Sequence, residues 1–403
     1  MISNSLLGGF LLRICCLLLF LLFVTAAKSA SSKVIRVFDV RKYGAVADGK
    51  RDNSKVFLQA WKDACQWRGK ARLYIPRGRY MVVGPLAFVG PCKSYMMVQV
   101  QGTLVAPYGL AKHNEDSWIK FQYINGLKIF GGGTFDGQGA SAWKYRKCNC
   151  RTLPVSIRFD FVTNGLVQRI HSINSKAFHV NVFACNKLKF KFLTITAPDD
   201  SPNTDGIHLG DSREVTVYDS HISTGDDCIS IGPGSFGTYI SKVVCGPGHG
   251  ISVGSLGKYP NEKDVVGLTV RNCTLKGTDN GLRIKTWGPS PPSVARNFTF
   301  EHIFMDNVRN PIIIDQDYCP SGSCGQQSPS QVHISDLSFK DVWGTSRTEL
   351  AVDLSCSSRV PCRNVKLENI RLPYKGSSRV STSSCSNAHG TSYGHQIPPS
   401  CLK

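Results

Sequence analysis

Four short segments in the middle of the chain carry most of the residues that could do chemistry. Each has two apolar residues separated by one other residue, with acidic, basic or histidine side chains beside them. The segments are Thr-Asp-Gly-Ile-His-Leu-Gly, Asp-Asp-Cys-Ile-Ser-Ile-Gly, Gly-His-Gly-Ile-Ser-Val-Gly and Asp-Asn-Gly-Leu-Arg-Ile-Lys, at residues 204–210, 226–232, 248–254 and 279–285. Aligned on the first apolar residue of each, they are 22, 22 and 31 positions apart. The four anchor residues are Ile207, Ile229, Ile251 and Leu282.

Three carboxylates and a histidine fall at matching places in this alignment. Asp205, Asp227 and His249 precede their anchors by two residues, and Asp226 precedes its anchor by three. If the segments are parallel strands stacked in register, matching positions lie about 4.8 Å apart. Carboxylates that close cannot all ionise without cost, so the pKa of one should rise. A protonated acid beside an ionised carboxylate suits glycoside hydrolysis, in which one group protonates the leaving oxygen and another activates water.

Two basic residues extend the same cluster. Arg283 and Lys285 follow their anchor by one and three residues, so both face the same side of the last segment. Exposed basic residues usually contact only solvent, but these two would border the carboxylates and could hold the carboxylate of an anionic substrate. A lone histidine is more often structural, but His249 shares the aspartate column. We therefore expect it to tune or relay a proton.

The repeat predicts an all-β chain folded as a parallel β-helix, a solenoid of stacked coils. A fixed period of about 20–50 residues indicates stacked units, and alternating apolar residues between glycines indicate short strands. A second alternating pattern, such as Leu166-Val-Gln-Arg-Ile, recurs roughly once per coil, so each coil should hold at least two strands. An antiparallel sandwich or barrel is the alternative, although hairpins would not require the shared register. Residues 53–65 are predicted to form a short N-terminal helix, capped by Asn53 or Ser54, that covers the end of the stack.

The start of the chain resembles a secretory signal peptide. Arg13 precedes an apolar run at residues 14–24 and then small residues, so residues 1–30 are predicted to be cleaved between about 26 and 30. The run is shorter than the roughly 20 residues that a membrane span requires, although an uncleaved anchor is the alternative. We expect a secreted protein with no membrane span, in which residues 31–403 form a single domain because a solenoid core grows along one axis.

The cysteines support an oxidising compartment. Two of the 16 cysteines lie in the predicted signal peptide, and many of the others lie close together in sequence, which is typical of disulfides. The predicted pairs are Cys228–Cys245, Cys319–Cys324, Cys356–Cys362, Cys385–Cys401 and Cys65–Cys92. Cys185 and Cys273 fall in apolar strand patterns and are predicted to be free. Cys148-Asn-Cys150 resembles half of a metal site, but it has no second half. Asn272 and Asn297 begin glycosylation sequons.

The formal net charge of +20 indicates an anionic partner. Nucleic acid is not expected outside the cell, and the basic residues are scattered instead of forming an arm. An acidic polysaccharide or an anionic membrane surface fits better, but charge alone does not choose between them.

The motifs resemble those of a known family. Asn203-Thr-Asp205, Gly225-Asp-Asp227, Gly248-His-Gly250 and Arg283-Ile-Lys285 match, in order, the four signature motifs of the polygalacturonases, glycoside hydrolase family 28. The similarity to plant members runs from about residue 37 to residue 401. It implies a single-stranded right-handed parallel β-helix and a secreted cell-wall enzyme that hydrolyses α-1,4-linked homogalacturonan in pectin with inversion. It also implies no metal and no cofactor, and we expect a monomer.

The resemblance also implies individual roles. Asp226 would be the general acid, Asp205 and Asp227 would activate water, and His249 would assist the acid. The substrate-binding residues would be Asn203, Arg283, Lys285 and Tyr318. The residues alone could not rank the three carboxylates. Stacked coils place Asp205 and Asp227 about 5 Å apart, whereas inversion needs about 6.5–9.5 Å between acid and base. We expect Asp226, one residue out of phase, to supply that distance.

Cleavage from the chain end is favoured over internal cleavage. The chain is more similar to the plant exopolygalacturonases of pollen, notably at residues 314–319 and 385–401. An endo-acting enzyme, or one that acts on rhamnogalacturonan or xylogalacturonan, is the first alternative. A pectin lyase shares the β-helix but uses an arginine base, and the three aspartates argue against it. A non-catalytic protein that binds wall polyanions is the alternative from another class, although acids in the cleft would hinder such binding.

Overall fold

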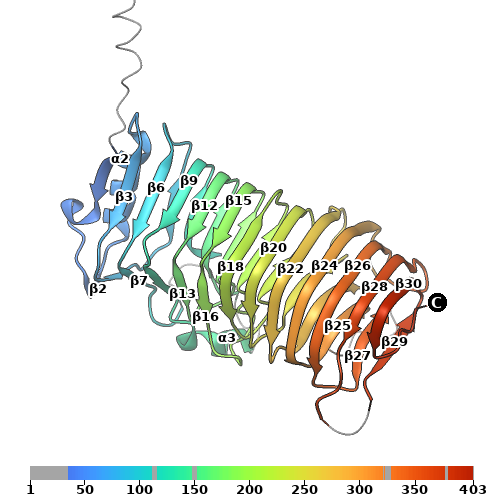
Figure 1. Cartoon of the computed structure of the whole chain (residues 1–403). Coiled ribbons are helices and arrows are strands. Elements are labelled where there is room, and N and C mark those ends of the chain that lie inside the picture. The colour runs from blue at the N-terminus through green and yellow to red at the C-terminus, as the bar shows by residue number, and fades with distance from the viewer. Residues whose placement is uncertain are drawn as a thin grey trace, which may run out of the picture.

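The chain folds into a right-handed parallel β-helix, as predicted (Figure 1). The computed structural model describes residues 35–110, 116–147, 152–320, 322, 328–376 and 380–402. Its strands form a 19-stranded sheet and an 11-stranded sheet, and the pairs within both sheets are parallel. The antiparallel alternative is therefore wrong. The predicted signal peptide, Cys148, Cys150 and Cys324 lie outside the described residues.

The 11-stranded sheet carries the four sequence segments, and the other sheet forms the rest of each coil. The 11 strands are β5 (Leu86–Val89), β8 (Ser117–Gln122), β11 (Val155–Asp160), β14 (Val180–Phe183), β17 (Ile207–Gly210), β19 (Ile229–Ile231), β21 (Ile251–Leu256), β23 (Asn280–Trp287), β25 (Asn310–Tyr318), β27 (Leu350–Ser355) and β29 (Thr382–Ser386). The 19 strands are β1 (Arg36–Asp39), β2 (Asp48–Asp52), β3 (Ala71–Ile75), β4 (Arg79–Met81), β6 (Met96–Val100), β7 (Thr103–Val105), β9 (Asn125–Phe130), β10 (Thr134–Asp136), β12 (Thr163–Gln168), β13 (His171–Ile173), β15 (Asn186–Lys191), β16 (Thr194–Thr196), β18 (Thr216–Ser223), β20 (Phe236–Cys245), β22 (Val265–Lys276), β24 (Ser293–Val308), β26 (Val332–Ser346), β28 (Cys362–Arg371) and β30 (Ala388–Ile397).

The predicted register is confirmed at every anchor. Ile207 pairs with Ile229, Ile229 pairs with Ile251, and Ile251 pairs with Leu282. All four anchors are buried. The longer gap before Leu282 holds the residues between β21 and β22 and the 12-residue strand β22 itself.

Apolar side chains stack in columns inside the coils and form one continuous core. Phe121 and Phe159 stack with ring centroids 5.5 Å apart, and Phe300 stacks on Phe339 at 4.8 Å. Each of these rings is about 1% exposed, so each buries nearly its whole surface. Burial of this kind stabilises a chain by roughly 25 cal/mol per Å² of apolar surface.

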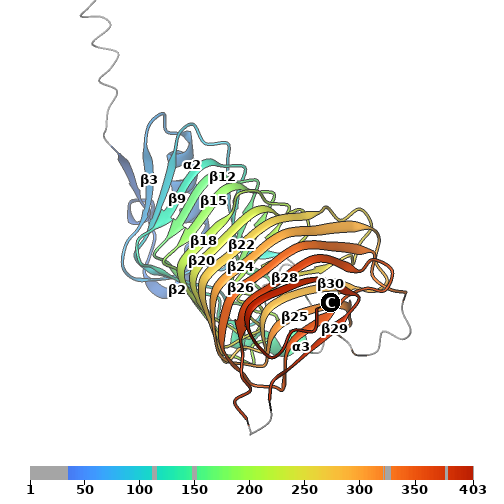
Figure 2. The ribbon, with the colours of Figure 1, turned by 45° about the vertical axis from the view of Figure 1, so that its right-hand side comes forward.

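Helix α2 (Ser54–Gln66) covers the N-terminal end of the stack, as predicted (Figure 2). Its buried face includes Phe57 and Trp61 and packs against β1, β3 and β5. Asn53 occupies the N-cap position, but its side chain makes no capping hydrogen bond. Its amide group instead bonds to backbone groups of Val46, Arg51 and Met81, so it joins the segment before the helix to the end of strand β4.

The cysteines behave largely as predicted. The structure contains Cys65–Cys92, Cys228–Cys245, Cys356–Cys362 and Cys385–Cys401. Cys185 and Cys273 are free and buried. The sequon residues Asn272 and Asn297 are both exposed. Within the described residues, no helix has the length and apolar character needed to cross a bilayer.

Replacing both Cys65 and Cys92 by alanine should lower the free energy of unfolding by about 3 kcal/mol. The disulfide closes a loop across a sequence separation of 27 residues and so reduces the conformational entropy of the unfolded chain. Guanidinium unfolding followed by circular dichroism measures the change. The free thiol variant Cys273→Ala is the control. An equal loss in that variant would show that sulfur packing, and not the crosslink, carries the effect.

Candidate active site

The outward-facing residues of the 11-stranded sheet form the floor of the candidate site. His208 pairs with Ser230, Ser230 with Ser252, and Ser252 with Arg283, on strands β17, β19, β21 and β23. The turns before these strands supply the aspartates and the histidine. Parallel pairing therefore turns four distant motifs into one continuous cluster.

Asp227 is a buried carboxylate that is neutralised by two cations. It accepts hydrogen bonds from Ser252 Oγ at 2.6 Å, Lys285 Nζ at 2.9 Å and Arg283 at 3.1 Å. Burial by itself would raise the pKa of Asp227, but the positive charges of Lys285 and Arg283 lower it overall. Asp227 is therefore ionised across the physiological range.

Asp205 lies one coil earlier, and among the described residues no basic side chain lies within 4.0 Å of its carboxylate. Its carboxylate accepts hydrogen bonds from Ser230 Oγ at 2.6 Å and from the Asn203 amide at 3.2 Å. Burial, together with the negative charges of Asp226 and Asp227, holds the pKa of Asp205 well above its usual value. The carboxyl whose pKa rises is thus Asp205, whereas the family resemblance places the proton donor at Asp226.

Asp226 forms a pair with His249. Its Oδ1 lies 3.0 Å from His249 Nδ1 and accepts the backbone N–H of Asp227 at 2.8 Å. The hydrogen bond to Asp226 raises the pKa of His249. On the other side of the ring, Nε2 lies 3.9 Å from a carboxylate oxygen of Asp279. Carboxylates on both sides of the ring favour its protonated form.

The out-of-phase position of Asp226 does not by itself give the separation expected for inversion. Oxygens of Asp226 and Asp227 and a ring nitrogen of His249 lie within 4.8 Å of one another. An inverting pair usually lies about 6.5–9.5 Å apart, with the water between its two groups.

The same three ligand atoms are a candidate metal site, but their neighbours fit a cation poorly. Asp227 is already bound by the ammonium of Lys285 and the guanidinium of Arg283, and His249 Nδ1 is engaged with Asp226. A divalent ion would have to displace or lie beside two positive charges.

The remaining two predicted substrate residues border this cluster. Asn203 has a left-handed backbone with φ of 55°, and its amide reaches Asp205. The Tyr318 ring lies 5.3 Å from Lys285 Nζ and packs edge to face on Trp287. The structure thus brings all eight predicted site residues together.

Three polar residues at the floor were missed from the sequence. Ser230 holds Asp205, Ser252 holds Asp227 and also accepts from Arg283 Nε, and His208 Nδ1 lies 2.8 Å from Ser230 Oγ. All three occupy the position directly after an anchor, which is the position of Arg283 in the fourth segment. The signal was present in the alignment. Burial lowers the pKa of His208 to about 4, so it is neutral and bonds to Ser230 without a charge.

This fold and this arrangement of side chains define a glycoside hydrolase built on a parallel β-helix. The chain belongs to the glycosyl hydrolases family 28, whose sequence model matches residues 65–396. This confirms the resemblance drawn from the four motifs.

Curated relatives agree with that assignment, and solved structures share the fold. The chain is 47% identical over 367 residues to an exopolygalacturonase of Platanus acerifolia, covering 90% of this chain and 97% of the relative. It is 46% identical over 388 residues to a polygalacturonase of Gossypium hirsutum, covering 95% and 94%. Among solved structures, an endo-xylogalacturonan hydrolase from Aspergillus tubingensis superposes with a TM-score of 0.76 at 20% identity, covering 90% of this chain and 100% of the other. The Erwinia carotovora polygalacturonase superposes with a TM-score of 0.67 at 24% identity, covering 87% and 96%. These two structural likenesses show the fold.

Asp205→Asn should raise the free energy of unfolding at pH 7 and leave it unchanged near pH 3. The fold raises the pKa of Asp205 above the unfolded value of about 3.9, so stability is lost as pH rises through the folded pKa. Asparagine has no proton to release. Urea unfolding at both pH values measures the effect.

Asp227→Asn is the matched comparison, because the fold lowers the pKa of Asp227. Its stabilising contribution is present above the unfolded pKa, so this variant should lose about 3 kcal/mol or more at pH 7, where it leaves buried cations unpaired. If Asp205→Asn also lost stability at pH 7, the raised pKa of Asp205 would be wrong.

Proposed function

We propose that the chain hydrolyses α-1,4-galacturonosyl linkages of polygalacturonan with inversion, acting from the chain end. The observation that carries this proposal is the convergence of three carboxylates beside one buried and one partly buried cation at one sheet of a family 28 β-helix. The relatives named exopolygalacturonase, at 47% identity in Platanus acerifolia and 43% in Zea mays, support the exo assignment.

In this proposal Asp226 donates the proton to the leaving oxygen. It is the most accessible of the three carboxylates, with a side chain that is 23% exposed against 2% for Asp227. His249, whose pKa is raised by its bond to Asp226, keeps a proton beside the donor and can return one after each turnover. A hydrogen bond to Asp226 holds the ring at Nδ1, and Asp279 lies 3.9 Å from Nε2.

Asp227 and Asp205 would act together on the water. Asp227 stays ionised and can accept a proton, because its cations lower its pKa. Asp205 has a raised pKa and can hold the water through a protonated oxygen until Asp227 takes the proton. Ser230 and Ser252 fix the orientation of the two carboxylates from the next coil.

Arg283, Lys285 and Tyr318 would bind the galacturonate ring next to the scissile bond. Arg283 uses only some of its five N–H donors on Ser252 and Asp227, so further donors remain for a substrate carboxylate. Asn203, whose amide bonds to Asp205, would contact the sugar beside that carboxylate. Binding a polyanion without cutting it is the competing function, but buried carboxylates would oppose it.

We also propose that the chain is exported as a monomer to the cell wall after removal of residues 1–30. Four disulfides among the described residues suit an oxidising compartment. The protein for the next test should therefore be recovered from the culture medium. Full-length chain that stays inside the cells would contradict export.

Timed chromatography of the products from polygalacturonic acid tests the function. Monogalacturonate should accumulate alone from the start, and proton NMR should show it released with the inverted, β anomeric configuration. Folded Asp226→Asn should turn over at least about 100-fold more slowly, which is the usual contribution of a general acid. A ladder of oligomers would reverse the exo assignment. Wild-type turnover in Asp226→Asn would remove the proposed acid.

Lys285→Met should separate the two proposed roles of this lysine, which are to lower the pKa of Asp227 and to bind the substrate. Without its charge, burial of Asp227 is opposed less and the pKa of Asp227 should rise, so activity should begin at a higher pH. KM for polygalacturonate should rise by about tenfold or more, because one charge-assisted contact of roughly 1.5–3 kcal/mol is lost. Lys258→Met, which removes an exposed amine above Trp287, is the control. A change in the pH profile with KM unchanged would leave Lys285 as a partner of Asp227 only.

A further inference from the structure

A second cluster of charged side chains lies on the outer face of the 19-stranded sheet, away from the carboxylates. This cluster, the basic face, consists of Lys128, Arg169, Lys187, Lys189, Lys191 and Arg213. Lys128 and Lys189 both pair with Leu166, so they lie in one column on rungs about 10 Å apart. Lys191 lies in the next outward column of the same strand as Lys189.

The cations of the basic face lack carboxylate partners. Among the described residues, none of the six lies within 4.0 Å of a carboxylate oxygen. Four of them lie over aromatic rings instead. The distances to the ring centroids are 4.9 Å for Lys128 on Phe130, 4.9 Å for Arg169 on Phe192, 5.6 Å for Lys191 on Phe192 and 5.1 Å for Arg213 on Phe236.

Farther along the same sheet, two basic side chains do pair with carboxylates. The column of Lys191 continues through Tyr218 and Ser241 to Arg271, Glu301, Lys340 and Glu368. There Arg271 pairs with Glu301 at 3.3 Å, and Lys340 pairs with Glu368 at 3.1 Å. Charge is therefore balanced within that half of this column, whereas Lys191 has no such partner.

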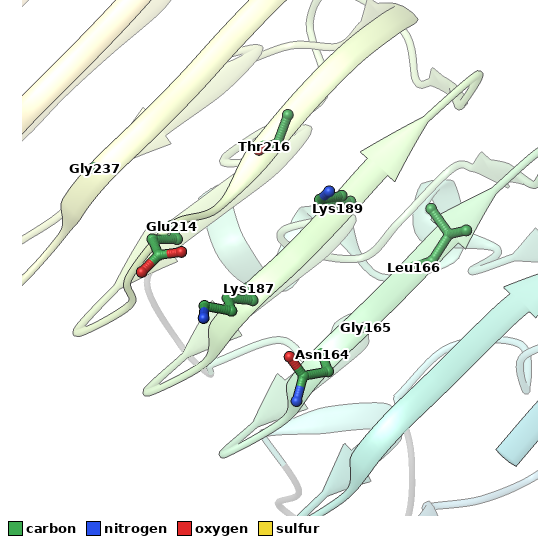
Figure 3. Close-up of a pocket in the computed structure, with 8 residues that line it drawn as sticks. All are labelled: Asn164, Gly165, Leu166, Lys187, Lys189, Glu214, Thr216 and Gly237. Carbon is green, nitrogen blue, oxygen red and sulfur yellow. The ribbon is translucent and has the colours of Figure 1, made fainter. Parts of the chain in front are cut away.

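The centre of the basic face is hollow. A cavity of about 420 Å³ is lined by Asn164, Gly165, Leu166, Lys187, Lys189, Glu214, Thr216 and Gly237 (Figure 3). Lys187 and Lys189 lie between the rung that carries Asn164 and the rung that carries Glu214. Glu214 is the one acid among the described residues that line this cavity, against the two cations Lys187 and Lys189. Exposed aromatic rings of Phe192, Phe236 and Tyr239 border it and offer apolar surfaces on which sugar rings can pack.

We propose that the basic face is a second, non-catalytic binding surface for an anionic polysaccharide, with galacturonan as its ligand. The preference for a polyanion follows from the unpaired cations, whereas the choice of galacturonan rests on the proposed function. The columns run along the axis of the solenoid, so a linear polymer can contact successive rungs. A second attachment point on the same polymer raises its effective concentration at the cleft.

The test compares two triple variants in the Asp226→Asn background, in which the polymer is not cut. Lys187→Gln, Lys189→Gln and Lys191→Gln neutralise the basic face. Arg296→Gln, Arg363→Gln and Lys366→Gln neutralise three exposed cations of β24 and β28 on the same sheet and serve as the control. Retardation in native gels that contain polygalacturonate gives the affinity, with and without excess digalacturonate to compete for the cleft. Circular dichroism checks that both triples are folded.

The basic-face triple should bind polygalacturonate about tenfold more weakly, because three exposed ionic contacts of about 0.2–1 kcal/mol each are lost. The control triple should change affinity by less than about twofold, since its cations lie outside the proposed surface. With excess digalacturonate, the parent protein should still be retarded by polygalacturonate in the gel, whereas the basic-face triple should not.

Three results would overturn the inference. Equal weakening in both triples would mean that only net charge matters. Complete loss of retention with digalacturonate would place all binding in the cleft. Binding to phosphatidylserine vesicles that depends on the three lysines, with polygalacturonate binding unchanged, would assign the face to membranes. Because binding is measured without cleavage, a wild-type protein that fails to cut polygalacturonate would refute the proposed function and leave this result standing.

Discussion

The backbone hydrogen bonds between successive coils are the constraint on which the rest of this structure depends. Gly206 N–H donates to the carbonyl of Asp227, Cys228 N–H to Gly250, and His249 N–H to Asp226, at 2.8–2.9 Å. These bonds fix the register in which the turns before β17, β19 and β21 follow one another. A slip of one residue would move every outward side chain to the core face. The cluster of acids therefore exists only while the ladder is intact.

The pKa of each aspartate in that cluster depends on which basic side chains are long enough to contact it from neighbouring coils. Lys285 lies two coils beyond Asp227 and still contacts it, because its long side chain spans the rungs between them. Asp205, one coil earlier, accepts hydrogen bonds from the neutral groups of Asn203 and Ser230 among the described residues. Two aspartates in the same register thus have pKa values displaced in opposite directions. That asymmetry pushes the pKa values of two neighbouring carboxyl groups apart, which is the usual way in which an active site separates acid and base roles.

The two outer faces of the solenoid use basic residues in different ways. On the 11-stranded sheet, Arg283 and Lys285 are nearly buried and both contact the carboxylate of Asp227. On the 19-stranded sheet, cations such as Lys187 and Lys189 are exposed and unmatched near the cavity of Figure 3. Buried, paired cations shape local pKa values, whereas exposed, unpaired cations attract distant polyanions.

The sequence alone determined the fold class, the register of Ile207, Ile229, Ile251 and Leu282, and the residues that meet at the site. This was possible because a parallel solenoid converts spacing along the chain directly into neighbourhood in space. Only the tertiary structure decided that Asp205 carries the raised pKa, that Asp226 lies close to Asp227, and that Asn53 bonds to three backbone segments instead of capping its helix. Those properties depend on burial and on partners from other coils, and spacing specifies neither the direction in which a side chain points nor the groups that surround it.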